Sequence, residues 1–279
     1  MADVAIHSPG NIAYRALSRF SVGEPGVSVS GRWVAAVRLS GALRTLFSRP
    51  EAILLLDQLV PGVEPYWRKI VTYCAWGNLQ ATLDEYLHHL HVSLGSPPVD
   101  DKLLLEIARM ASVALEMRSS TVEVFDPTDQ DAGYRRRFST RFALRFGGRR
   151  ENEESARQPV VRQAFNSPFH PFVLATTSIG QEGVDFHWWS RSVYHWNTPP
   201  NPIDFEQREG RVDRYDGLAV RRNLAARHGD DARRSGAANP WAKLYELASR
   251  EDHGLGSFAP HWTYPGEHRI ERHVARTPE

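Results

Sequence analysis

The sequence predicts a mixed α/β protein in which a helical subdomain, residues 1–118, precedes a parallel sheet with flanking helices, residues 119–279. Two observations support this prediction. From about Gly31 to Met117, apolar residues recur at helical spacing between residues that start and stop helices. After Ser119, β-branched and aromatic runs alternate with helical segments, and the continuous apolar run "FVLATTS" is typical of a parallel strand covered on both faces.

Three segments of the helical subdomain carry boundary signals. The segment "SRPEAILLLDQL" has a capping-box spacing from Ser48 to Glu51, with a proline in its first turn. The pair Gly77 and Asn78 predicts a break and a new helix start. Asp100 precedes the third segment, "DKLLLEIARMASVALEM". This subdomain contains no obvious chemistry, so we expect it to be a connector.

The second region has a different order of elements. The expected strands are "TVEVFDP", "RFSTRFALRFG", "FVLATTS" and "SVYHWN". The expected helices are "VVRQAFNS", the segment that starts at "NPIDFEQ", "LAVRRNLAARHG" and "PWAKLYELASR". A tail rich in Trp, Tyr and Pro completes the chain.

Composition excludes some classes of protein. The 279 residues are 41% hydrophobic and 24% charged, as in a folded globular protein. Lys+Arg number 34 against 33 Asp+Glu, so any polyanion partner must be argued from local clusters, in which arginine dominates. A single cysteine, Cys74, excludes an internal disulfide, and the run "AILLLDQLV" is too short and too interrupted by Asp57 to span a bilayer. We therefore expect a cytoplasmic protein that does not contact a membrane.

The segment "QREGRVDR" concentrates arginines beside a predicted helix start. Asn201 is a candidate cap that precedes a proline. We expect the helix to continue through this segment, so that Gln207, Arg211 and Arg214, at positions i, i+4 and i+7, share one face. Gly210 would then lie in the middle of the helix, where it would let a ligand approach closely.

A plainer interpretation of the same segment is a solvated surface. Glu206, Glu209 and Asp213 are local acids that could pair with the arginines. For an arbitrary arginine-rich helix this interpretation is the better one. The sequence that precedes the helix weakens it here.

Small polar residues end the expected strand "FVLATTS". Thr176, Thr177 and Ser178 are followed by Gly180 and Gly183. Ligands of open parallel sheets bind beyond the carboxyl ends of the strands, where hydroxyl groups and exposed backbone amides suit phosphate. Taken alone, this loop is a weak signal.

Together, the two segments resemble a known family. "VLATTSIGQEGVDF" resembles motif V, and "HWNTPPNPIDFEQREGRVDRYDG" resembles motif VI, of superfamily-two helicases and the related Swi/Snf-type translocases. The match is clearest from about Val160 to Asn223. Other stretches, such as "YWRKIVTYCAWGNLQATLDEYL", look like the distal half of large bacterial helicases, so the resemblance covers most of the chain.

The resemblance implies a RecA-like fold of the P-loop NTPase type, the second of two such domains that hold ATP between them. Arg211 and Arg214 would be arginine fingers that reach the γ-phosphate. Gln207 and Arg208 would couple the domain interface to the nucleotide. Asp213 departs from the histidine expected in close relatives, which leaves the fingers intact and the details of their positioning open.

The motif V segment would contact both the nucleotide and the nucleic acid. Asp185, next to Gly183, matches the position that reaches the nucleotide ribose. Thr177 and Ser178, with Thr176 as a weaker candidate, match positions that touch the nucleic-acid backbone. The implied partner is nucleic acid, with DNA favoured over RNA.

The sequence lacks the other half of an ATP site. It contains no GxxxxGK[ST] loop, and none of its three lysines, Lys69, Lys102 and Lys243, follows a glycine. ATP and its Mg²⁺ would therefore be held mainly by a first RecA-like domain, absent from this sequence and supplied in cis or in trans. The alternative is a non-catalytic module that binds nucleic acid or docks onto a helicase.

Other clusters support plainer interpretations. Glu85, His88 and His91 could suggest a metal, but the pattern favours a wet helix end without one. The stretches "YRRRFSTRFALRFGGRR" and "VRRNLAARHGDDARR" are either solvated surfaces or nucleic-acid contacts. Trp188 and Trp189 are expected to pack at a domain surface, with stacking on bases as the alternative.

Overall fold

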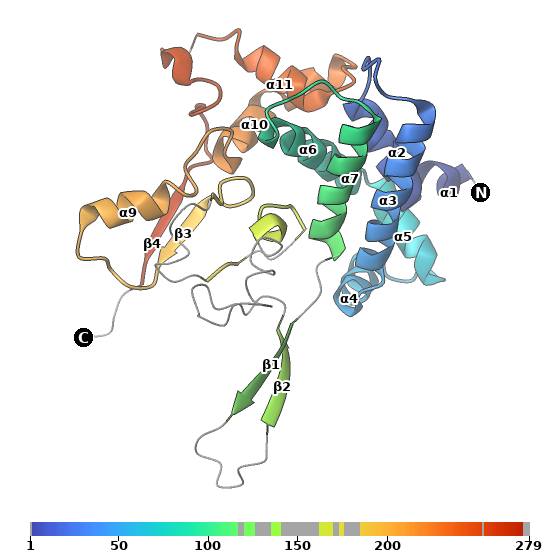
Figure 1. The fold of residues 1–279 in the computed structure, drawn as a ribbon, viewed down its shortest axis with the longest axis horizontal. Coiled ribbons are helices and arrows are strands. Elements are labelled where there is room, and N and C mark those ends of the chain that lie inside the picture. The colour runs from blue at the N-terminus through green and yellow to red at the C-terminus, as the bar shows by residue number, and fades with distance from the viewer. Residues whose placement is uncertain are drawn as a thin grey trace.

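The computed structural model describes most of the chain. It covers residues 2–116, the backbone of 120–125 and 135–140, and residues 162–169, 173–175, 185–252 and 254–275. Within this part the protein is a mixed α/β structure that is mostly helical (Figure 1).

Residues 2–116 form a series of α-helices. They are α1 (Ala2–His7), α2 (Pro9–Phe20), α3 (Val29–Phe47), α4 (Pro50–Leu59), α5 (Tyr66–Ala75), α6 (Asn78–Ser93) and α7 (Asp101–Glu116).

Local capping explains several of these boundaries. The carboxylate of Asp100 accepts a hydrogen bond from the backbone N–H of Leu103 at 2.7 Å, which supports the predicted start of α7. The predicted break between α5 and α6 is confirmed at Gly77, whose φ of 87° favours glycine. The predicted cap at Ser48 is wrong, because Ser48 ends α3 and Arg49 precedes α4 without a side-chain cap.

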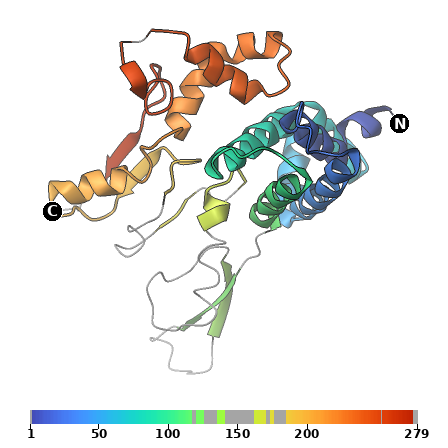
Figure 2. The same cartoon turned by 45° about the horizontal axis from the view of Figure 1, so that its top comes forward.

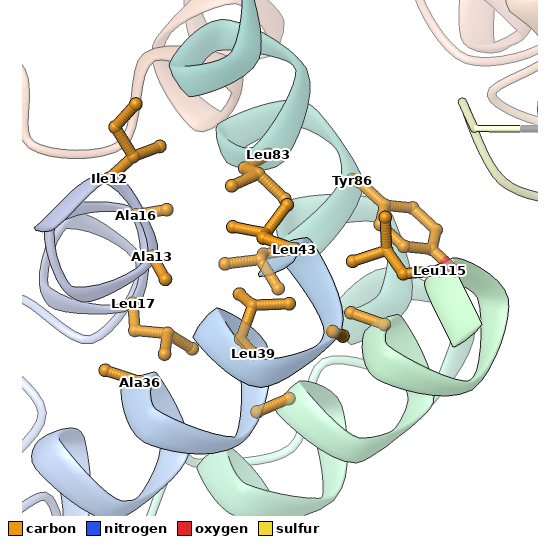
Figure 3. Packing of buried hydrophobic residues seen from close by; sticks show 14 of the residues in the cluster. Ile12, Ala13, Ala16, Leu17, Ala36, Leu39, Leu43, Leu83, Tyr86 and Leu115 are labelled. Atoms are coloured by element: carbon orange, nitrogen blue, oxygen red, sulfur yellow. The ribbon is translucent and has the colours of Figure 1, made fainter. Parts of the chain in front are cut away.

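An apolar core holds these helices together. Helix α3 lies between α2 and α7, and leucines from α2, α3 and α6 meet in the interior (Figure 3). Leu17, Leu39, Leu43 and Leu83 are fully buried. Burying each such side chain contributes about 1.5–3 kcal/mol, so this core is the main source of stability for the helical part.

The remainder of the described chain contains four short strands and three longer helices. These are β1 (Ser120–Phe125), β2 (Arg135–Thr140), β3 (Ser192–His195), α9 (Pro202–Glu209), α10 (Leu218–Arg234), α11 (Pro240–Ala248) and β4 (Glu271–Val274), with a 3₁₀ turn at Gly256–Phe258. A further helical turn covers residues 162–165.

Pairing of the strands differs from the expected continuous parallel sheet. Strands β1 and β2 form an antiparallel hairpin that projects away from the helices (Figures 1 and 2). Parallel pairing in the described part joins β3 to β4, with Ser192 opposite Glu271. Of the expected strand "FVLATTS", residues 173–175 are described and are not in a strand. The arginine-rich stretch after β2 lies outside the described residues.

A second, smaller core stabilises the carboxyl-terminal helices. Helix α10 packs on α11, and Val220, Leu224, Tyr245, Ala248 and Tyr264 are buried between them and the following chain. In both views these helices lie beside the end of α6, while α9 with β3 and β4 lies farther out (Figures 1 and 2).

Among the residues described, no helix is both long enough and apolar enough to cross a bilayer.

Candidate functional site

The described part of the chain contains only some of the predicted site residues. Asp185, Gln207, Arg208, Arg211 and Arg214 are described. The predicted site residues that precede Asp185 lie outside the described residues: Thr176, Thr177, Ser178 and Gly183. The observed geometry therefore concerns the arginine segment and the described chain that begins at Asp185.

Helix α9 begins where the sequence predicts and ends earlier than expected. The side chain of Asn201 accepts a hydrogen bond from the backbone N–H of Ile203 at 3.0 Å, and Pro202 is the first helical residue. The last helical residue is Glu209, and Gly210 is the C-cap. The prediction that Gln207, Arg211 and Arg214 share one helical face is therefore wrong.

Burial explains why the chain leaves the helix at this point. After Gly210 the backbone continues in tight turns, with the N–H of Val212 bonded to the carbonyl of Glu209 at 2.9 Å. These turns bury Val212, which is 5% exposed. They also bring the carbonyl of Arg211 to the backbone N–H of Phe186, at 2.8 Å. The arginine segment is thus shaped by its contact with the chain at Phe186.

Contacts between α9 and the parallel strands explain how the helix is held. Glu209 forms an ion pair with Arg272 of β4 and lies 3.5 Å from His195 of β3. The buried ring of His195 also meets Phe205 edge to face, with centroids 4.7 Å apart. Glu209 therefore ties α9 to the two-stranded sheet rather than pairing with arginines of its own segment.

Arg214 is the arginine that is clearly fixed in place. Its Nε donates to the carbonyl of Gly210 at 2.8 Å and lies 3.1 Å from Oδ1 of Asp185. Asp185 is itself held, since the side-chain amide of Asn166 donates to its carbonyl at 2.7 Å. The structure thus brings together two predicted site residues, Asp185 and Arg214, from the two motif segments.

The other predicted residues have different surroundings. Arg208 donates from Nη1 to the carbonyl and side-chain oxygens of Asn197, at 3.1 and 3.2 Å, so it braces the loop after β3. Gln207 is exposed. Arg211 is half-buried, and within the described part of the chain no acidic side chain pairs with it. Its guanidinium is therefore a cation without a described counter-charge.

A solvated surface would pair the arginines of this segment with its own acidic residues, and those pairs are not seen among the described residues. Among the described residues, neither Glu206 nor Asp213 pairs with an arginine, and Glu209 pairs with Arg272. The basic helix α10 behaves differently. Several of its arginines have acidic partners at the surface: Arg227 with Glu251, Arg233 with Asp230 and Arg234 with Asp231. For these three, the solvated interpretation is supported.

Sequence reasoning missed a fully buried arginine behind the site. Arg221 of α10 lies 3.0 Å from Oε1 of Glu85 on α6, and its Nη1 donates to the carbonyl of Asp216 at 2.8 Å. It also donates to the carbonyl of Trp188 and lies over the ring of Trp189, 5.0 Å from its centroid. Trp188 and Trp189 thus pack around a buried cation. No local pattern distinguishes this arginine from its neighbours.

The cluster around His88 is not the wet helix end that the pattern favoured. His88 stacks on Tyr245, with centroids 6.2 Å apart, and its neighbour His89 is 2% exposed between aromatic rings. The Nε2 of His91 donates to the carbonyl of Pro97 at 2.7 Å. Among the described residues, no group of three or more potential ligands could hold a metal ion.

Burial lowers the pKa of three histidines near Arg221. It lowers the pKa of His88 to about 4, that of His187 to about 4, and that of His89 well below its usual range. The cause in each case is desolvation, to which Arg221 adds repulsion. These three histidines are therefore neutral in the folded protein at neutral pH.

We expect the protein to lose stability as the pH falls from about 6.5 to about 4. A histidine with a lowered pKa in the folded state stabilises the protein above the pKa of the unfolded chain. That stability is lost on acidification, because only the unfolded chain then takes up the proton. Each such histidine contributes a slope of up to about 1.4 kcal/mol per pH unit. Urea unfolding at a series of pH values measures this slope.

The variant His89→Leu removes one of these titrations and should make the slope shallower. His273→Leu is the control, since His273 lies on β4 with its side chain 42% exposed. Equal slopes for His89→Leu and the unchanged protein would contradict this assignment.

Comparison with known proteins adds no identification. No protein-family model, curated protein or solved structure matches this chain. Function therefore has to be argued from the arginine segment and its surroundings.

Proposed function

We propose that the chain is the second RecA-like half of an ATP-dependent helicase or translocase that acts on nucleic acid. Arg211 and Arg214 would be the arginine fingers of an ATP site shared with a first RecA-like domain, supplied in cis or in trans. ATP binding would close the two domains, and hydrolysis would let them reopen.

The observation that carries the proposal is the contrast between the two arginines. Arg214 is anchored to Asp185 and to the carbonyl of Gly210, whereas Arg211 has no acidic partner among the described residues. A half-buried guanidinium without a counter-charge favours an anionic ligand, because a desolvated cation gains most from a partner that completes its charge balance. The γ-phosphate of ATP is such an anion.

The roles of the remaining residues follow from the resemblance. Asp185 and Gly183 would lie toward the nucleotide ribose. Gln207 would face the domain interface, and Arg208 would support it through its contact with Asn197. Contacts to the nucleic-acid backbone would come from the residues that end the expected motif V strand: Thr176, Thr177 and Ser178.

The catalytic contribution of this chain would be electrostatic. As the terminal phosphoryl group leaves ATP, negative charge develops on its oxygens, and a preplaced arginine stabilises that charge without reorganising. The first domain would hold ATP and Mg²⁺, because this sequence has no phosphate-binding loop.

We expect the chain by itself to hydrolyse ATP no faster than a protein-free blank. A polypeptide that carries a GxxxxGK[ST] loop, encoded in frame upstream or by a neighbouring reading frame, should restore hydrolysis when mixed or joined with it. Phosphate release, with and without single-stranded and duplex DNA or RNA, measures this. The control is the same partner with its loop lysine changed to alanine.

Two results would contradict the proposal. Turnover by the chain alone would show that it holds a complete site. Nucleic-acid binding by the chain, combined with no stimulation of any such partner, would support the non-catalytic alternative.

A further inference from the structure

The arginine segment ends in an unusual backbone position. Asp216, two residues after Arg214, has a φ of 54° and is 2% exposed. Residues other than glycine rarely adopt this left-handed conformation, and they keep it only where their surroundings hold it. The contacts of Asp216 therefore determine where the arginine segment ends.

His261 holds Asp216 in two ways. The backbone N–H of Asp216 donates to the carbonyl of His261 at 2.8 Å. The imidazole Nδ1 of His261 lies 2.7 Å from Oδ1 of Asp216 and donates to that carboxylate. Since the Asp216 side chain is 3% exposed, the imidazole supplies the hydrogen bond that a buried carboxylate requires.

Two aromatic rings orient the imidazole. Tyr215 stacks on one side of His261, with centroids 4.8 Å apart and an interplanar angle of 3°. Tyr245 of α11 also stacks on His261, at 5.0 Å and 9°. Since Tyr215 is the neighbour of Arg214 in sequence, this stack clamps the end of the arginine segment.

Two lines of contact continue from this clamp to helix α6. The ring of Tyr245 stacks in turn on His88 of α6. The carbonyl of Asp216 accepts from Arg221, whose Nε lies 3.0 Å from Glu85 of α6. Glu85 and His88 are three residues apart and therefore neighbours on one face of the helix. The arginine segment is thus connected to the helical subdomain by one polar and one aromatic route.

We propose that Asp216 and His261 are positioning residues that fix the arginine segment against helix α6 and thereby set the orientation of Arg211 and Arg214. In this role they would act through the arginine segment rather than by contact with the nucleotide. The expected effect on ATP hydrolysis rests on the proposed function. The expected effect on the position of the arginine segment does not.

The experiment uses the full chain and the Nε–H signal of Arg214 in a ¹⁵N NMR spectrum. This N–H is bonded to the carbonyl of Gly210 beside Asp185, so it should exchange slowly with water. In His261→Ala, its exchange should accelerate by about tenfold or more, because the end of the segment is released. Arg214→Lys assigns the signal by removing it. The Nε–H of Arg15, bonded to Gln80 in the helical subdomain at 3.2 Å, reports whether the fold is kept.

Conservative and control variants separate positioning from general damage. His261→Asn can keep a side-chain N–H near the Nδ1 position, so it should retain slow exchange at Arg214 better than His261→Gln. His273→Ala is the matched control, since His273 also stacks on a tyrosine, Tyr194, with centroids 4.3 Å apart. It should leave the Arg214 signal unchanged. If His261→Ala also loses the Arg15 signal, Tyr215→Leu takes its place, because Tyr215 is 41% exposed and lies outside the buried core.

An unchanged Arg214 signal in a folded His261→Ala or Tyr215→Leu variant would overturn the proposal. So would an equal effect of His273→Ala. In an assembled ATPase, His261→Ala should lower kcat while leaving KM for ATP unchanged. If exchange at Arg214 accelerates in His261→Ala but no partner polypeptide gives ATP hydrolysis with this chain, the proposed function fails. The positioning role of Asp216 and His261 then still stands.

Discussion

Replacing Arg221 with methionine should lower the free energy of unfolding by about 3–5 kcal/mol. The substitution removes the ion-pair partner of the largely buried Glu85, and it leaves the carbonyls of Asp216 and Trp188 without their donor. Removing one member of a buried pair is costly, because the remaining charge stays desolvated and uncompensated. Urea or thermal unfolding followed by circular dichroism measures the loss.

Arg222→Met is the matched control, since Arg222 is the next residue of α10 and is exposed. Its effect should stay within about 0.5 kcal/mol. The double variant Glu85→Gln with Arg221→Met should recover part of the stability, because the uncompensated carboxylate is then gone. Similar losses for Arg221→Met and Arg222→Met would contradict the role assigned to the buried pair.

The loss in Arg221→Met should also depend on pH. Burial already raises the pKa of Glu85, and Arg221 opposes that rise. Without Arg221 the pKa rises further, and a raised pKa in the folded state favours folding below the pKa of the unfolded chain and loses that effect as the pH rises. The deficit relative to the unchanged protein should therefore be largest at neutral pH and smaller near about pH 4.3.

In the ATPase that we propose this chain completes, Arg211→Ala should lower kcat by about 10³-fold or more, with nucleotide binding largely kept. The binding energy for ATP would come mainly from the first domain, whereas the charge that develops during hydrolysis would meet the arginine. Single-turnover hydrolysis and equilibrium binding of a fluorescent ATP analogue measure the two effects separately. Arg250→Ala is the control, because Arg250 is an exposed arginine paired with Glu246 on α11.

Arg214→Ala should lower turnover as well, through the loss of a proposed finger and through a loosening of the segment. Its guanidinium holds Asp185 and the carbonyl of Gly210, so its removal also loosens the segment that carries Arg211. Arg211→Ala should therefore leave the free energy of unfolding almost unchanged, while Arg214→Ala reduces it. Full turnover in Arg211→Ala would refute the assignment of this residue as a finger.

Local sequence signals predicted several boundaries correctly. The start of α9 at Pro202 follows from the cap at Asn201, and the start of α7 follows from Asp100, because these interactions join residues only two or three positions apart. The break at Gly77 depends on a conformation that favours one residue type. The helical character of residues 2–116 and the mixed α/β class could thus be predicted from periodicity and turn residues.

Strand pairing and the end of α9 could not be predicted in this way. Strand β4 lies in a tail without a clear alternation, and it is defined by its pairing with β3 across the sequence. The helical pattern around "QREGRVDR" continues past Glu209, but the helix stops there because Val212 is buried and the chain docks on Phe186. Tertiary burial overrides a weak helical preference at glycine.

By itself, the sequence determined which residues make the arginine segment and where its helix begins, since those features depend on neighbours along the chain. Only the tertiary structure decided which ionisable side chains contact one another. Arg221 and Glu85 are 136 positions apart, and Asp216 and His261 are 45 apart, so no periodicity links them. Their pairing follows from desolvation, because a buried charge must find its partner wherever the fold places one.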